Sequence, residues 1–271
     1  TLTVDGSIAT GAAVSVMLIR AGVSPIATLP IAFLAGALAG MVTGLLNTAL
    51  GIPGILASIL TQISLYSINL NIMGKANQPV SVDNYPLVVS LRYVTDGSVS
   101  RLLFFLGMIV FLLALIAVMY WYFGTEQGHA IRATGCNSNM ARAQGINTNF
   151  IKVLALMISN GLVGLCGALY GQFQGASDVN MGRGAIVIGL AAVIIGEVLF
   201  GKFASKRKLA FAFTLASVIL GAVIYYMVYQ FVLWLKMPSE DMKLFSAIVV
   251  AIFLAIPYLK EKRTLRKGAS K

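Results

Sequence analysis

The sequence predicts an all-α membrane protein, a polytopic bundle of about eight transmembrane helices. Of its 271 residues, 58% are hydrophobic and only 11% are charged, whereas soluble domains carry about a quarter charged residues. Several apolar stretches reach the length of about 20 residues that a helix needs to cross the hydrocarbon core. Apolar and polar residues do not alternate within these stretches, as they would in the strands of a membrane barrel, so helices are expected.

Six long apolar stretches are the predicted regular spans, at residues 26–46, 50–70, 101–123, 151–173, 209–235 and 244–259. Two more stretches, 7–19 and 184–201, are short and rich in glycine, so we expect glycine-broken or tilted helices there. Each follows or contains an aspartate ahead of small residues, a pattern that points to a transport site built from discontinuous helices. The predicted transmembrane domain covers residues 1–259, and a basic tail follows at 260–271.

The distribution of basic residues predicts the orientation of the chain. With eight alternating spans, one face receives the segment 126–150, the run at 202–208 and the tail, which together with Lys152 carry thirteen of the 20 lysines and arginines. Basic residues concentrate on the cytoplasmic side, so 126–150 is predicted to be cytoplasmic and the segment 75–101 extracellular. The tail can also bind anionic lipid head groups. Nucleic-acid binding is not expected, because the basic residues are spread between spans.

Small residues predict where the helices touch. Gly36, Gly40 and Gly44 recur every four residues in one span. Gly161, Gly164, Gly167 and Gly171 lie on one face of another. Because lipid provides no hydrophobic drive for helix association, such faces are expected to be close helix contacts.

Polar side chains at membrane depth are costly unless they line water or bond to each other, so they are the candidates for a translocation path. For each of them, a helix-to-helix hydrogen bond or an interfacial position is the competing interpretation. The candidates are Asp5, Ser7, Asn47, Thr61, Gln62, Ser64, Asn69, Asn160, Gln172, Gln174, Asp178, Asn180 and Glu197.

Few residues could carry catalytic or cofactor chemistry. The chain has one histidine, His129, and two cysteines, Cys136 and Cys166, which are expected to be free thiols. The sequence contains no G-x-x-x-x-G-K-[ST] loop, so no ATP site is expected in this chain. We therefore predict that the protein is not an enzyme and holds no metal and no cofactor of its own.

The polar segment between two spans, "EQGHAIRATGCNSNMARAQGIN", predicts a short cytoplasmic helix. Asn137 is a suitable N-cap, and Gly145 lies where a helix commonly ends in a left-handed turn. Met140 and Ala141 are available for apolar contacts, and Arg132 and Arg142 for charged contacts with a protein or with lipid phosphates. A simple connector is the alternative.

Three motifs in order resemble a known family. "LTVDGSIATGAA", "GHAIRATGCNSNMARAQGINT" followed by "SNGLVGLCGALYGQFQG", and "DVNMGRGAIVIGLAAVIIGEVLFG" are similar to the permease subunits of bacterial ABC importers in the branched-chain amino acid and simple-sugar (ribose) permease family. Within this family, the sequences of these motifs are most similar to those of the group of tryptophan or tyrosine transport permeases. In that family a hydrophobic span precedes the first motif, so at least one more span is expected ahead of it.

The resemblance implies a type II-like importer architecture in the bacterial cell membrane. Two permease subunits, expected here as a homodimer, would form the path. Two cytoplasmic ATPases, which carry ATP and Mg²⁺, would dock on a coupling helix, and an extracellular binding protein would deliver the solute, with the segment 75–101 as its candidate docking surface. The residues that match or lie in the ATPase-coupling loop are Arg132, Ala133, Thr134, Gly135, Asn137, Met140, Ala141, Arg142, Gly145, Ile146 and Asn147.

The resemblance implies that the transported solute is an amino acid, with aromatic amino acids among the candidates, or a similar small polar molecule. Aromatic residues do not decide this, because Trp and Tyr also gather at bilayer interfaces. A secondary carrier driven by an ion gradient is the alternative, and Asp5 and Glu197 are the ionisable groups that it would use. A membrane-embedded enzyme is poorly supported, because the sequence offers no pair of nucleophile and base.

Overall fold

The fold was analysed in a computed structural model, which describes residues 2–81, 85, 87–90, 98–204, 210–234 and 251. Nine helices and two short strands make up this part of the chain. In order they are α1 (Val4–Arg20), α2 (Pro25–Thr48), α3 (Gly54–Met73), β1 (Asn77–Pro79), α5 (Ser98–Phe123), α6 (Glu126–Cys136), α7 (Ser138–Ala143), α8 (Thr148–Gln174), β2 (Ala176–Asp178), α9 (Ala185–Ala204) and α10 (Ala210–Trp234).

The predicted helical membrane protein is confirmed. Among the described residues, five helices are long and apolar enough to cross a membrane, and they lie in α2, α3, α5, α8 and α10. α1 and the shorter apolar helix Ala185–Leu199 within α9 match the two glycine-rich stretches. The predicted span at 244–259 lies outside the described residues apart from residue 251, so the number of eight spans stays a prediction.

The expected breaks in the two glycine-rich helices are absent. α1 runs unbroken through Gly6 and Gly11, and α9 runs unbroken from Ala185. In the second glycine-rich stretch the irregular backbone lies just before α9, at Gly184, whose φ of 89° is in the left-handed region. Within α1 the glycines serve packing instead, because a Cβ on Gly11 would come 1.9 Å from the Gly164 carbonyl oxygen.

α2 and α8 form an antiparallel pair with touching backbones. A Cβ on Gly36 would lie 2.2 Å from the carbonyl oxygen of Asn160, and one on Gly40 would lie 2.2 Å from that of Leu156. Gly44 faces Val153 one turn further along. The first predicted glycine face thus packs on α8, where Gly36 meets Gly164, whereas Gly167 and Gly171 of the second face pack on α1. We call the contact between α2 and α8 the α2–α8 seam.

α1 packs on α8 in the parallel direction, through Gly11 against Gly164 and Gly167 against Ile8. Ser7 of α1 is level with Asn160, the thirteenth residue of the 27-residue α8. At about 1.5 Å per residue, α8 is long enough to cross the bilayer, so the start of α1 lies near the middle of its depth. α3 packs on α1 and α2.

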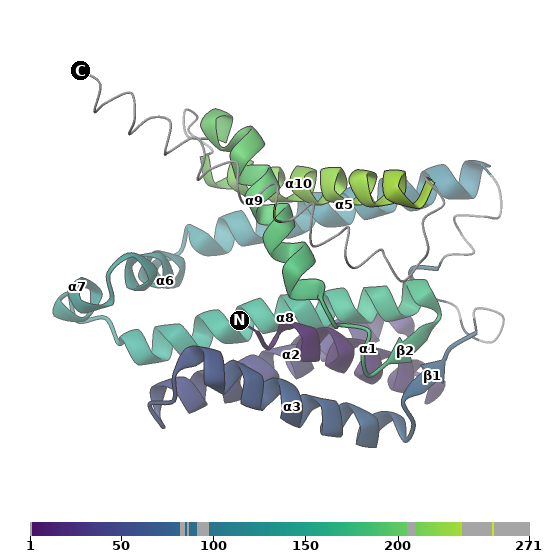
Figure 1. Ribbon diagram of the computed structural model, residues 1–271, viewed down its shortest axis with the longest axis horizontal. Coiled ribbons are helices and arrows are strands. Elements are labelled where there is room, and N and C mark those ends of the chain that lie inside the picture. The colour runs from purple at the N-terminus through teal and green to yellow at the C-terminus, as the bar shows by residue number, and fades with distance from the viewer. Residues whose placement is uncertain are drawn as a thin grey trace. The chain divides into compact units, whose positions relative to one another are not determined.

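The two ends of this bundle differ (Figure 1). β1 and β2 pair in antiparallel register, with Asn77 opposite Asp178, at the end where α3 and α8 finish. α6 and α7 lie at the other end, where α5 finishes and α8 begins. The charge rule predicts that the first end is extracellular and the second cytoplasmic, and this orientation stays a prediction.

α9 and α10 belong to a second compact unit, which also includes residues Ile116–Tyr120 of α5. Their backbones also touch at glycines, since a Cβ on Gly196 would lie 2.2 Å from the Ser217 carbonyl oxygen. Ala191, Ile195 and Tyr225 form the buried core of this pair.

Candidate functional site

The connection between α5 and α8 is a pair of short helices, α6 and α7, which we call the α6–α7 hairpin. Thr125 caps α6, and Arg132 donates a hydrogen bond of 2.6 Å from Nη2 to the Phe123 carbonyl oxygen at the end of α5. The sequence predicted only one helix here, so α6 was missed, although Thr125 is a suitable N-cap and Glu126 follows it in the first turn. Gly128 packs against the backbone of Phe123.

α7 is the helix that the sequence predicted. The Asn137 Oδ1 accepts the backbone N–H groups of Asn139 and Met140 at 3.1 and 3.0 Å. After the helix, Gly145 has a φ of 82°, as the predicted left-handed turn requires. Both cap predictions are therefore confirmed.

The hairpin is also fixed to α8. Arg142 Nη2 donates to the Thr148 Oγ1 at 3.2 Å, and Asn147 caps α8 by accepting the Phe150 N–H at 3.2 Å. Arg132 and Arg142 thus each bond to their own chain, although both side chains are also exposed. The hairpin is bound to the ends of both α5 and α8.

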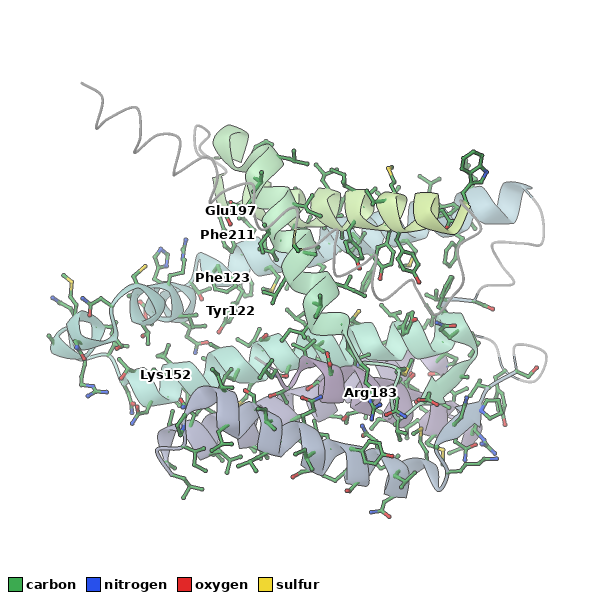
Figure 2. All side chains as sticks on the ribbon, viewed as in Figure 1. Tyr122, Phe123, Lys152, Arg183, Glu197 and Phe211 are labelled. Atoms are coloured by element: carbon green, nitrogen blue, oxygen red, sulfur yellow. The ribbon has the colours of Figure 1, made fainter. Side chains whose placement is uncertain are left out.

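The predicted coupling residues divide into exposed and internal ones. Ala141 and Thr134 are buried, and Ile146 is half-buried. Met140 is 64% exposed, and Phe150, which the sequence analysis did not single out, is 58% exposed. The exposed remainder of the predicted set is Arg132, Ala133, Gly135, Asn137, Arg142, Gly145 and Asn147. His129 is exposed at this end too, as expected, and Lys152 lies in the first turn of α8 (Figure 2).

Four of the candidate path residues meet in a polar cleft of about 290 Å³ between α1, α3 and the turn after β2. They are Asp5, Gln62, Asn69 and Asn180. Tyr66 and Arg183 also line this cleft, and the sequence analysis had not placed either of them in the path. Gly182 lies against the Asp5 backbone, which brings the turn that carries Arg183 beside α1 (Figure 2).

Four other candidates bond between or within the helices. Ser7 Oγ donates to the Asn160 Oδ1 at 2.9 Å, and Thr61 accepts from Thr43 at 3.0 Å. The Gln172 Oε1 accepts the Val88 N–H at 3.1 Å, and its Nε2 donates to the Ser15 Oγ at 3.2 Å. All four side chains are buried, so the competing interpretation, a helix-to-helix bond, describes them.

The remaining candidates lie outside the cleft. Asn47 and Ser64 donate to backbone carbonyl oxygens of Ile52 and Leu60. Gln174 bonds to Tyr170, and Asp178 accepts the Asn180 N–H at 2.7 Å. Glu197 is exposed on α9, in the separate unit.

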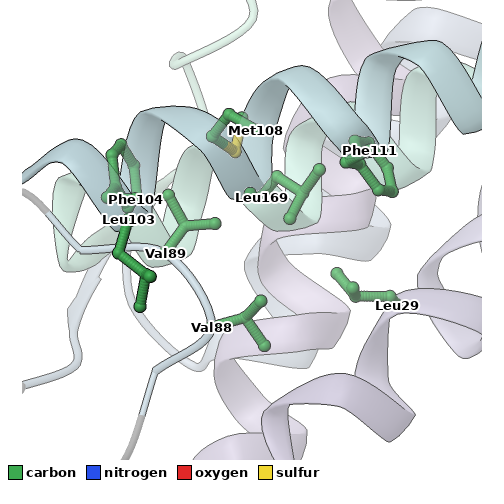
Figure 3. A pocket seen from close by; sticks show the side chains of 9 residues that line it. Leu29, Val88, Val89, Leu103, Phe104, Met108, Phe111 and Leu169 are labelled. Atoms are coloured by element: carbon green, nitrogen blue, oxygen red, sulfur yellow. The ribbon is translucent and has the colours of Figure 1, made fainter. Parts of the chain in front are cut away.

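A second cavity, of about 410 Å³, is apolar (Figure 3). Leucine, valine, phenylalanine and methionine side chains from α2, α5, α8 and residues 88–89 point into it, among them Leu29, Phe104, Met108, Phe111 and Leu169. A polar solute would find no hydrogen-bonding side chain there, so the polar cleft is the candidate solute site.

Comparison with known proteins identifies the chain's relatives. The family model described as branched-chain amino acid transport system / permease component matches residues 2–257. The chain belongs to this permease family. No solved structure matches it.

Curated relatives of this permease carry related names. It is 39% identical over 254 residues to the tyrosine transport system permease protein of Clostridioides difficile (strain R20291), covering 94% of this chain and 80% of the relative. It is 28% identical to an autoinducer 2 import system permease protein of Yersinia pseudotuberculosis (serotype O:3, strain YPIII), over 86% of this chain and 62% of the relative. An inner membrane ABC transporter permease protein of Escherichia coli (strain K12) is 25% identical over 66% of this chain and 53% of the relative.

These relatives and the five apolar helices establish a multi-pass bacterial membrane permease of the ABC transporter type. The sequence-based assignment to the amino acid and sugar permease family is therefore confirmed.

Proposed function

We propose that this permease forms, with a second copy of itself, the path by which an ABC importer carries an amino acid into the cell. The name of the C. difficile relative favours tyrosine or a similar aromatic amino acid as the solute. In this proposal an extracellular binding protein delivers the solute at the end that carries β1 and β2. Two ATPase subunits drive the cycle from the cytoplasmic end.

The observation that carries the proposal is the attachment of the α6–α7 hairpin to two spans at once. Arg132 binds the last carbonyl group of α5, and Arg142 and Asn147 bind the first turn of α8. A short element held at both ends moves as one piece, so a push on it displaces both helices. The exposed apolar side chains of Met140 in the hairpin and Phe150 in the first turn of α8 suit a protein contact rather than a solvated loop.

The experiment compares Met140→Asp with Lys75→Glu in the permease co-purified with its ATPase subunit. Lys75 is exposed at the opposite end of the bundle and serves as the matched charge-change control. We expect Met140→Asp to reduce co-purification and solute-stimulated ATP hydrolysis by about tenfold, because a carboxylate in an apolar contact is desolvated without a partner. Lys75→Glu is expected to keep ATPase assembly.

Unchanged assembly in Met140→Asp would show that this surface is not the ATPase contact. A secondary carrier predicts another result in vesicles: uptake would continue when ATP is depleted and the membrane potential is kept. Uptake that stops under these conditions supports the importer.

A further inference from the structure

The polar cleft between α1, α3 and the turn after β2 presents both signs of charge near the middle of the membrane. Asp5 contributes a half-buried carboxylate from α1, and Arg183 contributes a guanidinium from the turn. Such groups at membrane depth are rare and mark solute or ion pathways. Gln62 and Asn180 add neutral donors and acceptors to the same wall.

Asn69 is the most informative residue of the cleft. Its side chain is 0% exposed, and neither its Nδ2 nor its Oδ1 has a hydrogen-bonding partner in the described part of the chain. Leaving a buried amide unsatisfied costs about 1–3 kcal/mol, so native proteins rarely do so without a functional reason. Its place in the lining of the cleft points to a bound molecule as the partner.

Tyr66 gives the cleft an aromatic wall. It is 44% exposed and lies three residues before Asn69 and four after Gln62, so all three residues share one face of α3. An aromatic ring packs favourably beside another ring in offset or edge-to-face geometry. The cleft thus combines the side chains of Asp5, Arg183 and Tyr66 with the Asn69 amide, whose two polar atoms have no partner among the described residues.

We propose that this cleft is a transmembrane binding site for a zwitterionic aromatic amino acid. The Asp5 carboxylate binds the ammonium group, the Arg183 guanidinium binds the carboxylate, and the Asn69 amide bonds to the same head group. Tyr66 packs against the side chain of the solute. This inference rests on the proposed import function and adds to it a site inside the permease itself.

The volume of about 290 Å³ is close to the lower limit of roughly 300 Å³ for pockets that bind small molecules. A single small solute suits such a space. A carboxylate and a guanidinium match the ammonium and carboxylate groups of an amino acid, whereas a sugar carries neither charge, so the lining favours an amino acid over a sugar. The sugar is nevertheless an explicit arm of the test.

The test measures binding to the purified full-length permease in lipid nanodiscs, without ATPase or binding protein. The probes are L-tyrosine, tyramine, which lacks the carboxylate, 3-(4-hydroxyphenyl)propionate, which lacks the amine, and D-ribose. The variants are Asp5→Asn, Arg183→Gln and Asn69→Leu. Ser67→Ala, at an exposed position of α3 outside the cleft, is the control.

Each variant is expected to lose the interaction with a different group of the ligand. Asp5→Asn weakens L-tyrosine and tyramine by about tenfold or more and leaves the propionate unchanged, because a charged hydrogen bond contributes about 1.5–3 kcal/mol. Arg183→Gln weakens L-tyrosine and the propionate and leaves tyramine unchanged. Asn69→Leu weakens L-tyrosine while its thermal unfolding stays at or above that of the wild type, because it removes an unsatisfied buried amide.

Several results would overturn the site. These are L-tyrosine affinity unchanged in all three variants, ribose binding as tight as L-tyrosine binding, or no L-tyrosine binding by the wild type at millimolar concentration. Size-exclusion profiles and unfolding curves separate loss of the site from loss of the fold. ATPase assembly of the wild-type permease is measured separately. If the cleft does not bind L-tyrosine but the ATPase assembles normally, the proposed import function stands. If the ATPase does not assemble, that function is overturned by this result alone.

Discussion

Single glycines decide how closely the helices of this permease approach. At Gly40 a Cβ would lie 2.2 Å from the Leu156 carbonyl oxygen, well inside any real contact, and backbone atoms cannot swing aside. At Gly107 of α5 nothing lies within 4 Å. The same residue type therefore has opposite sensitivity at the two positions.

We predict that Gly40→Ala destabilises the permease by about 1–3 kcal/mol, because α2 and α8 must separate to admit the methyl group. Gly107→Ala is the matched control and is expected to be neutral or slightly stabilising, since alanine favours helix. Thermal unfolding in detergent, followed by size-exclusion chromatography, compares the two. Equal unfolding temperatures would contradict the close approach at the α2–α8 seam.

At the residue scale, two buried asparagines differ in a way that the sequence does not predict. Asn160 and Asn69 are both buried asparagines in spans, and their local sequences do not separate them. Only the fold shows that Asn160 receives Ser7 from α1, whereas Asn69 has no partner among the described residues and lines the cleft. Whether a polar residue bonds to a helix or faces a path depends on what packs opposite, and that is a long-range property.

At the scale of elements, the helix caps of the α6–α7 hairpin were readable from local sequence. Asn137 and Gly145 act within a few residues of their own positions, so the chemistry of the cap predicts the structure. The long spans were predictable for a similar reason, because apolar length alone indicates them. For α1 and α9 the sequence predicted broken or tilted helices, and only the break is ruled out, since glycine content does not tell a break from a tight contact.

We predict that Asn137→Ala loosens α7 by about 1 kcal/mol, the usual cost of a lost N-cap. Hydrogen exchange of residues 138–143 would become faster, and ATPase stimulation would fall with it. Asn139→Ala, which removes an exposed amide from the same helix, is expected to leave both unchanged. Equally slow exchange in the two variants would argue against the capping role.

At the scale of the whole molecule, the two free cysteines report the orientation in the membrane. Cys136 is exposed in the α6–α7 hairpin, and Cys166 lies in the spanning helix α8. A membrane-impermeant maleimide is therefore expected to label wild-type permease in inside-out vesicles and not in right-side-out vesicles. Cys136→Ser should abolish the labelling, and labelling of right-side-out vesicles would reverse the predicted topology.

The α2–α8 seam constrains how such a permease can change shape. Backbone meets backbone at Gly36, Gly40 and Gly164, so at these points no flexible side chain lies between the two helices to absorb sliding. α2 and α8 therefore resist sliding past each other and are expected to move together. Because the α6–α7 hairpin is fixed to the start of α8, a push on the hairpin would carry α2 along with α8.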